Sequence, residues 1–357
     1  MNFKSVKKLS FSKLAQSPIV ISLFSLILSL VVSGIIMAFA GFSPLEAYGA
    51  MFVGAFGGLS NFADTLGIAT PLIFTGLAVT IAMRGGILNV GCEGQLYIGG
   101  MAAALTGAYV KGLPAIIHIP ICFLAAMLAG GLWAVLAGVI KIRANANEVI
   151  ITIMLNYIAI YLTDYLASYV FKADGMVVKT NEIMHSAVLP QLYPHSRLTI
   201  GLLFALLAMV FIAWILKSTI LGYNIRALGQ NPYAAEAGGI RKNRMILFTF
   251  LLSGALAGMA GAIEVQGVHT YFISNFSNGY GWDGLATSVL GQYNPFGTVL
   301  ASLFYGAMRN GATMMDRMTK MPPDFVVIMQ ALAIIFIATP SIIRKVMSIF
   351  AKRRGQI

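Results

Sequence analysis

Charge is scarce in this chain: of its 357 residues only 10% are Asp, Glu, Lys or Arg, against about 25% in an ordinary soluble domain. Apolar residues make up 58% and form nearly continuous runs from Pro18 to Pro340. This composition excludes a soluble catalytic domain and indicates a membrane protein. Cysteine is scarce too. Cys92 and Cys122 both lie in apolar runs, which excludes a disulfide framework and argues against a four-ligand structural zinc site.

Motifs of catalysis and nucleotide binding are also missing. The four histidines, His118, His185, His195 and His269, lie far apart without a metal-binding spacing. The phosphate-binding pattern G-x-x-x-x-G-K-[ST] does not occur, and no paired nucleophile and base stand out. We therefore predict no enzyme, no metal site and no cofactor bound by this chain. If ATP drives transport here, the ATPase with its ATP and Mg is another polypeptide.

The basic residues indicate the orientation of the chain in the membrane. Lys and Arg number 24 against 12 Asp and Glu, a net charge of +12. In a membrane protein such an excess lies in cytosolic loops, so we expect no nucleic-acid partner. At about 20 residues per span, the apolar runs predict an all-α polytopic protein with about ten transmembrane helices. The predicted spans are 19–40, 64–83, 87–110, 114–140, 148–171, 198–217, 244–265, 282–292, 295–315 and 325–343.

Both termini are predicted to be cytosolic, and the first span to remain uncleaved because it is too long for a signal peptide. On the ten-span path, 17 of the 24 basic residues lie inside. A single crossing over 282–315 would leave 15 inside, so ten spans fit the positive-inside rule better. The cytosolic termini contribute Lys4, Lys7, Lys8, Lys13, Arg344, Lys345, Lys352, Arg353 and Arg354.

We treat the chain as one transmembrane domain, 1–357, with a first half 1–217, a cytosolic loop 218–243 and a second half 244–357. Each half contains one glycine-interrupted polar region, Gly85 to Gly100 and Gly279 to Gly297, and the corresponding helices run in opposite directions. This arrangement is typical of inverted repeats with a substrate path at their interface. Alternatively, the glycines only allow close helix packing.

Several polar residues lie inside the apolar runs. A carboxylate at mid-bilayer costs about 3 kcal/mol, so such a residue is a functional candidate by default. Asn89 and Glu93 are four apart and would share one helical face, whereas Gln95 would point elsewhere. Alternatively, Glu93 braces a broken helix by accepting hydrogen bonds from backbone N–H groups.

A second polar stripe lies on the fifth predicted span. It consists of Glu148, Thr152, Asn156 and Thr163, and it lines a hydrated path or supplies interhelical hydrogen bonds. In the second half, a short half-helix starts near Asp283, which suits the helix dipole, and ends at Gln292. The candidate path residues are Asn89, Glu93, Gln95, Thr152, Asn156 and Gln292.

The cytosolic loop contains a short helix with clear start and stop signals. Asn231 is a good N-cap, Pro232 suits the first helical position, and Gly238 or Gly239 would end the helix. At about two turns it is not stable alone. We therefore expect a cytosolic partner to order it, with the small side chain of Ala235 facing that partner. The alternative is a surface loop with an incidental turn.

These motifs resemble those of the permease subunits of bacterial ABC importers for sugars, branched-chain amino acids and nucleosides, over nearly the whole chain. The Gly86 to Gln95 segment is most similar to nucleoside-type permeases, although Cys92 stands where a small apolar residue is expected. The other motifs are Leu228-Gly229-Gln230-Asn231-Pro232 with Ala235 and Gly239-Ile240, and Asp283-Gly284-Leu285-Ala286 followed by Gly291, Asn294-Pro295 and Gly297.

The resemblance implies a vitamin-B12-permease-like fold of the type II ABC importers in the bacterial cell membrane. It further implies three protein partners: a second related permease forming a heterodimer, a cytosolic ABC ATPase, and an extracytoplasmic substrate-binding lipoprotein received by a face that includes 172–197. The ATPase would grip the loop through residues Leu228, Gly229, Asn231, Pro232, Ala235 and Gly239.

The expected function is ATP-driven nucleoside uptake by alternating access. One alternative within the family is a simple-sugar importer. From another class, the alternative is an ion-coupled secondary transporter, in which Glu93 and Glu148 would bind protons or cations. The lack of a dense charge relay and the capped cytosolic loop count against that alternative.

Overall fold

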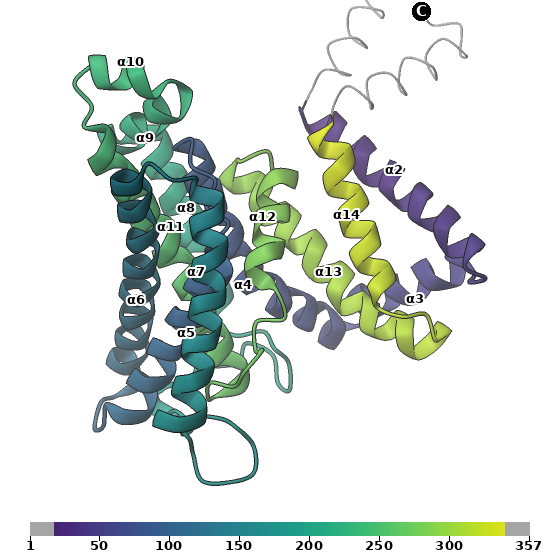
Figure 1. Cartoon of the computed structure of the whole chain (residues 1–357). Coiled ribbons are helices and arrows are strands. Elements are labelled where there is room, and N and C mark those ends of the chain that lie inside the picture. Colours follow the sequence, from purple (N-terminus) through teal and green to yellow (C-terminus); the bar gives the residue numbers. More distant parts are fainter. Residues whose placement is uncertain (1–17, 340–357) are drawn as a thin grey trace, which may run out of the picture. The chain divides into compact units, whose positions relative to one another are not determined.

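The computed structural model describes residues 18–339 as an assembly of α-helices (Figure 1). The basic residues predicted at the two cytosolic termini therefore lie outside the described residues. The chain divides into two compact units: a central unit, Gly58–Ala307, and a terminal unit whose described residues are 18–57 and 308–339.

Thirteen α-helices are found in the described part of the chain. They are α2 (Pro18–Phe39), α3 (Pro44–Phe56), α4 (Leu59–Arg84), α5 (Cys92–Tyr109), α6 (Ala115–Ala144), α7 (Glu148–Tyr165), α8 (Gly201–Ser218), α9 (Ile220–Gln230), α10 (Pro232–Ala237), α11 (Lys242–Glu264), α12 (Tyr280–Leu290), α13 (Pro295–Thr319) and α14 (Asp324–Ala338). Two π-helical turns, η1 (Leu166–Val170) and η3 (Val265–His269), extend α7 and α11, and a short 3-10 helix, η2 (His185–Ala187), lies between α7 and α8.

A helix lies at each of the ten predicted spans. Five are long and apolar enough to cross a membrane: α4, α6, α7 with η1, α8, and α11 with η3. The predicted all-α polytopic architecture is therefore confirmed. The half-helix is also confirmed, because the eleven residues of α12 rise only about 16 Å, half of a hydrocarbon core about 30 Å thick.

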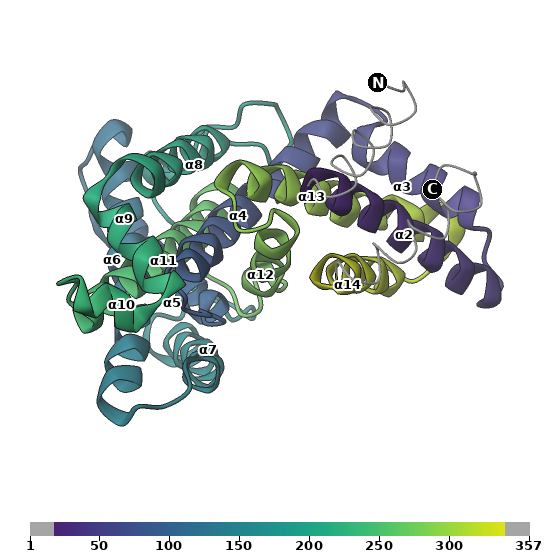
Figure 2. The same cartoon turned by 90° about the horizontal axis from the view of Figure 1, so that it is seen from above.

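The centre of the central unit is built from α4, α5, α6 and α11, and Figure 2 shows α5 and α11 between α6, α7 and α8. Glycines allow the backbones to touch. A Cβ atom on Gly258 would lie 2.2 Å from the carbonyl oxygen of Ala126, and one on Gly261 would lie 2.1 Å from that of Leu96. Small residues serve this purpose in membrane helices because apolar side chains gain little by leaving lipid.

The terminal unit packs α2 against α14, and α3 against the end of α13. The rings of Phe42 and Phe325 meet edge to face at 5.6 Å. The side-chain amide of Asn310 donates to the carbonyl oxygen of Gly54 at 3.1 Å. Helix α3 was not among the predicted spans, and at thirteen residues it is too short to cross a membrane alone.

The two ends of the central unit differ in character. Helices α9 and α10 lie at the upper end in Figure 1, and the 172–197 segment lies at the lower end. Backbone hydrogen bonds tie that segment to the chain beyond α11: Thr180 to Phe272 at 3.0 Å and Leu189 to Gln266 at 2.9 Å. The two long polar stretches thus form opposite surfaces of one unit.

Candidate functional site

The first predicted glycine-interrupted region is a break between two helices. Helix α4 ends at Arg84 and α5 begins at Cys92. Gly86 between them has φ +70°, a left-handed conformation that favours glycine. Gly86 at the start of the break is exposed, but the backbone then enters the interior of the unit, where Asn89 is 0% exposed. The polar groups of its buried part must be satisfied by protein, since non-helical backbone within a membrane is tolerated only where protein or a water-filled cavity surrounds it.

Asn89 and Gln95 form a reciprocal amide pair across the break. The Asn89 amide donates to the Gln95 oxygen at 3.0 Å, and the Gln95 amide donates back at 3.1 Å. Asn89 also donates to Ser253 Oγ on α11 at 2.8 Å. The prediction that Gln95 points away from Asn89 is therefore wrong. It assumed a continuous helix, whereas Asn89 lies in the non-helical break and can fold back over the first turn of α5.

Asn156 of α7 bridges the same break from the other side. Its Oδ1 accepts from the backbone N–H of Gly94 at 2.8 Å, and its Nδ2 donates to the carbonyl oxygen of Val90 at 2.9 Å. Asn89, Gln95 and Asn156, which we call the amide cluster, thus hold the break, α5, α7 and α11 together. Each is at most 2% exposed, so the cluster is a closed brace in this conformation.

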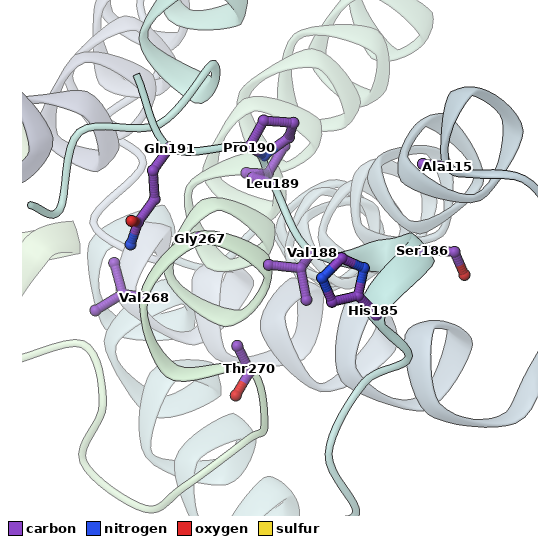
Figure 3. Close-up of a pocket in the computed structure, with 10 residues that line it drawn as sticks. All are labelled: Ala115, His185, Ser186, Val188, Leu189, Pro190, Gln191, Gly267, Val268 and Thr270. Carbon is purple, nitrogen blue, oxygen red and sulfur yellow. The ribbon is translucent and has the colours of Figure 1, made fainter. Parts of the chain in front are cut away.

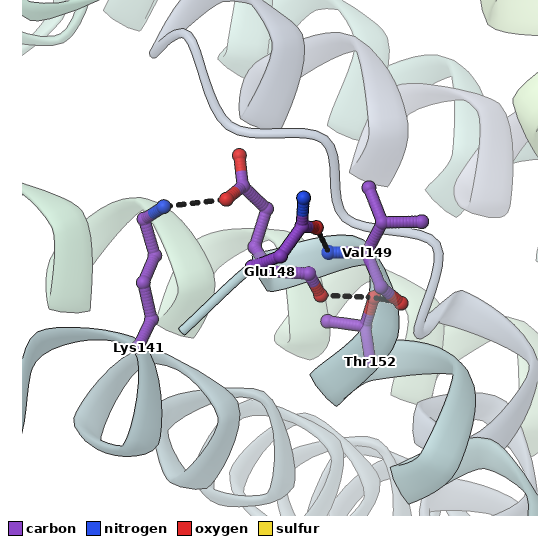
Figure 4. Close-up of polar contacts among 5 residues, drawn as sticks. Lys141, Glu148, Val149 and Thr152 are labelled. Atoms are coloured by element: carbon purple, nitrogen blue, oxygen red, sulfur yellow. Dashed lines mark hydrogen bonds and ion pairs between the residues drawn. The ribbon is translucent and has the colours of Figure 1, made fainter. Parts of the chain in front are cut away.

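The remaining residues of the α7 stripe have local partners. The Thr152 hydroxyl donates to the Glu148 carbonyl oxygen at 2.7 Å, one turn back in its own helix (Figure 4). Glu148 forms an ion pair with Lys141 of α6 at 2.5 Å, with both side chains roughly one fifth exposed. The Thr163 hydroxyl likewise bonds within α7, to Ala159 at 2.9 Å. Of this stripe, Asn156 alone joins the amide cluster.

Glu93 connects the first glycine-interrupted region to the second. Its Oε2 accepts from the backbone N–H of Gly281 in the first turn of α12 at 2.6 Å, and the residue is only 4% exposed. This is the bracing contact considered from the sequence, but it reaches a helix of the other half. Asp283 lies in the same first turn, so two carboxylates face the positive end of the α12 dipole.

Hydrogen bonds of hydroxyl groups connect α12 and α13 to α4. Thr80 lies 2.8 Å from both Ser288 and Thr298, and Thr75 donates to the Tyr280 carbonyl oxygen at 3.0 Å. A Cβ atom on Gly284 would lie 2.5 Å from the Thr75 hydroxyl. The structure therefore brings the two predicted glycine-interrupted regions into direct contact.

Gln292 is separate from the amide cluster. It follows α12, at the opposite end of that helix from Glu93, with φ +53°. The neighbouring Tyr293 carbonyl oxygen accepts from Arg84 Nε at 2.8 Å, which places this turn beside the end of α4. Among the predicted path residues, Gln292 is thus set apart from the other five.

Sequence reasoning missed two buried polar residues at the far end of α11. Glu264 is 1% exposed and lies 3.7 Å from His269 Nε2 across the η3 turn. Gln266 is fully buried and donates to the Ala187 carbonyl oxygen at 2.8 Å. Applying the insertion cost used for Glu93 to every carboxylate would have found Glu264.

A pocket of about 610 Å³ opens between the 172–197 segment and η3 (Figure 3). It combines apolar walls with a few hydrogen-bonding side chains, as binding pockets do. Its lining residues are Ala115, His185, Ser186, Val188, Leu189, Pro190, Gln191, Gly267, Val268 and Thr270. Within residues 18–339, no group of His, Cys, Asp or Glu side chains could hold a metal ion.

The predicted short helix in the cytosolic loop is α10. Asn231 caps it by accepting from the N–H groups of Tyr233 and Ala234 at 3.0 and 3.1 Å, and it ends before Gly238 as predicted. Its outer face exposes Tyr233, Ala234, Glu236 and Ala237.

Ala235, by contrast, is only 5% exposed. The expectation that its small side chain faces a partner is therefore wrong. Helix α10 contacts this chain's own α9 and α11 and buries Ala235, so its order comes from intramolecular packing.

Comparison with known proteins adds to this geometry. A family model described as "Branched-chain amino acid transport system / permease component" matches residues 61–338. The chain is 37% identical over 343 residues to the guanosine ABC transporter permease protein NupP of Bacillus subtilis (strain 168). The aligned region covers 94% of this chain and 98% of that relative.

Two further relatives cover most of the chain. The nucleoside ABC transporter permease protein NupB of Lactococcus lactis subsp. cremoris (strain MG1363) is 29% identical over 91% of this chain and 92% of the relative. The glucose ABC transporter permease protein TsgB13 of Haloferax volcanii is 31% identical over 92% of this chain and 89% of the relative. No solved structure matches the chain.

Proposed function

The chain belongs to the family of branched-chain amino acid transport system permease components, and from this membership we propose that it forms the membrane pathway of an ABC importer for nucleosides. It is a transport subunit and not an enzyme, and ATP hydrolysis is carried out by a separate ATPase subunit. The observation that carries the nucleoside assignment is the 37% identity, over nearly the full length of both chains, to a guanosine permease.

A simple sugar is the second candidate substrate, because a relative named as a glucose permease is 31% identical over 92% of the chain. Uptake into vesicles that contain the assembled importer separates the two. We expect ATP-dependent accumulation of labelled guanosine that excess unlabelled nucleoside abolishes and excess glucose leaves unchanged. If glucose but not unlabelled nucleoside inhibited the uptake, the substrate would be a sugar.

The proposed architecture is ten membrane helices in two inverted repeats, as in vitamin-B12-type permeases. Two observations support it: a helix lies at every predicted span, and α4 and α5 of the first half meet α12 and α13 of the second through Glu93, Thr75 and Thr80. We place the end with α9 and α10 in the cytosol and the 172–197 segment outside.

Three protein partners follow from this proposal. The ATPase docks on the exposed face of α10. A binding lipoprotein docks over the 172–197 segment and the pocket between that segment and η3. A second related permease completes the pathway as a heterodimer. The two docking surfaces lie at opposite ends of the central unit (Figure 1), as vectorial transfer through the membrane requires.

We further propose that the amide cluster, with Glu93 and Thr152, lies beside the substrate path and closes it in this conformation, and that Gln292 belongs to the cytosolic end of that path. The support is that these buried polar side chains form hydrogen bonds to the backbone of the broken helix. If those hydrogen bonds are exchanged for others, the break can adopt a second arrangement. Against ion coupling, Glu93 accepts from a backbone N–H and Glu148 pairs with Lys141.

A further inference from the structure

Two residues first assigned to ATPase docking pack against the rest of this chain. Leu228 and Gly229 lie near the end of α9, and Asn231 alone separates α9 from α10. Leu228 is only 2% exposed. Leu228 is therefore closed to a partner that binds the outer face of α10, and the close packing of both residues on the rest of the chain indicates another role for them.

Gly229 lies directly on the break between α4 and α5. A Cβ atom on Gly229 would lie 2.2 Å from the Arg84 carbonyl oxygen and 2.9 Å from the Gly86 nitrogen. In the reverse direction, a Cβ atom on Gly86 would lie 2.9 Å from the Gly229 Cα. The contact is thus backbone on backbone, and no side chain fits between the two segments.

Leu228 extends the contact by one residue. It belongs to a buried apolar cluster with Ile87 of the break, Ile151 and Leu155 of α7, and Phe250 of α11. The end of α9 is therefore joined to the break in two ways, through the backbone at Gly86 and through the apolar cluster that contains both Leu228 and Ile87. Close packing of this kind transmits displacement because protein interiors are dense and do not deform continuously.

From Ile87 the covalent chain leads straight into the amide cluster. Asn89 follows two residues later and bonds to Gln95 and Ser253. Glu93, in the first turn of α5, then accepts from Gly281 of α12. A continuous series of short contacts thus runs from the end of α9, next to α10, through the break and α5 to α12 of the second half.

We propose that the contact of Gly229 with Gly86, together with the apolar cluster shared by Leu228 and Ile87, is a transmission joint that passes movement of α10 to the broken helix. This proposal rests on the proposed function, since the joint transmits movement only if an ATPase moves α10. Gly229, Gly86 and Leu228 are positioning residues: they act through the break and do not contact the ATPase.

The test uses the assembled importer in vesicles, with Gly229→Ala as the main variant. Three quantities are measured: ATPase that co-purifies with the permease, ATP hydrolysis with and without the loaded binding protein, and guanosine uptake. We expect normal co-purification and unstimulated hydrolysis, together with about a tenfold loss of uptake and of the stimulation by binding protein, the size typical of a coupling free energy between two sites.

Gly131→Ala serves as a milder packing control. Gly131 is also tightly packed, with its added Cβ atom 2.9 Å from Leu251 Cδ1, but it joins α6 to α11 away from the break. We expect uptake and stimulation near those of the unaltered importer. Equal losses in both variants would show a general packing effect and overturn the joint.

Leu228→Ala keeps the proposal testable if Gly229→Ala fails to accumulate, because it shortens a side chain without inserting an atom. Stimulation should fall while the ATPase stays bound. Loss of ATPase binding in Leu228→Ala would show that Leu228 belongs to the docking surface. Full stimulation by the binding protein would contradict the proposed joint. Absence of ATP-dependent uptake by the unaltered importer would instead contradict the proposed function itself.

Discussion

At the residue scale, the central unit shows how polar side chains are made tolerable inside an apolar helical protein. Asn89, Gln95 and Asn156 are almost wholly buried, yet each amide has a partner in the break or the helices beside it. An unpartnered buried polar group costs about 1–3 kcal/mol, so the pairing decides whether the broken helix can exist at all. The same residues therefore support structure and any movement of the break.

Asn156→Leu should destabilise the permease by about 2 kcal/mol, because the Gly94 N–H and the Val90 carbonyl oxygen lose their partner in a buried environment. Thermal unfolding of the detergent-solubilised chain measures this. Thr163→Val is the matched control in the same helix, since its hydroxyl bonds only within α7, and we expect almost no change. A melting temperature of Asn156→Leu equal to that of Thr163→Val would contradict the bracing role.

Glu93→Gln should retain most of the uptake, because the amide oxygen can still accept from the Gly281 N–H. Glu93→Leu removes that acceptor from the Gly281 N–H and breaks the contact between α5 and α12, so uptake should be largely lost. Both variants are compared with and without an imposed proton gradient. Uptake that needs the gradient, and loses that need in Glu93→Gln, would support an ion-coupled transporter instead.

At the element scale, α10 is a short helix with two distinct faces. Its inner face buries Ala235 against α9 and α11, whereas Tyr233, Ala234, Glu236 and Ala237 are exposed. A helix of six residues is not stable alone, and here it is held by its cap and by its own chain. Adjacent alanines in one helix can therefore have different roles.

Ala234→Trp and Ala235→Trp should fail in different ways. A tryptophan at the exposed position 234 should block the ATPase, leaving a permease that accumulates normally but no longer co-purifies the ATPase or supports uptake. A tryptophan at the buried position 235 should overpack the contact with α9 and α11 and lower the amount of folded permease. Full ATPase association in Ala234→Trp would place the docking surface elsewhere.

At the scale of the whole molecule, the central unit presents α10 at one end and the 172–197 segment at the other (Figure 1). The pocket lies against that segment. The amide cluster and Glu93 lie along the buried helices between them. If the first surface meets the ATPase and the second meets the binding protein, the unit connects an energy source to a substrate source across the bilayer. The orientation of these two ends is directly measurable.

Single cysteines at Glu236 and Asp174 should label oppositely in intact cells. Both native cysteines are buried, so an impermeant thiol reagent should leave the unaltered chain unmodified. Asp174→Cys should react from outside, and Glu236→Cys only after the membrane is permeabilised. Efficient labelling of Glu236→Cys in intact cells would reverse the topology drawn from the basic residues.

The sequence by itself determined the helical membrane architecture, the positions of the ten apolar segments, the half-helix before Gln292 and the capped helix at Asn231. These features depend on local information: hydrophobic run length, glycine and proline positions, and capping chemistry. Only the tertiary structure decided that Gln95 turns back to Asn89, that Glu93 reaches Gly281, that Ala235 faces inward and that Gly229 rests on Gly86. Those contacts join residues brought together by packing or by a non-helical backbone, and helical periodicity along one segment carries no information about either.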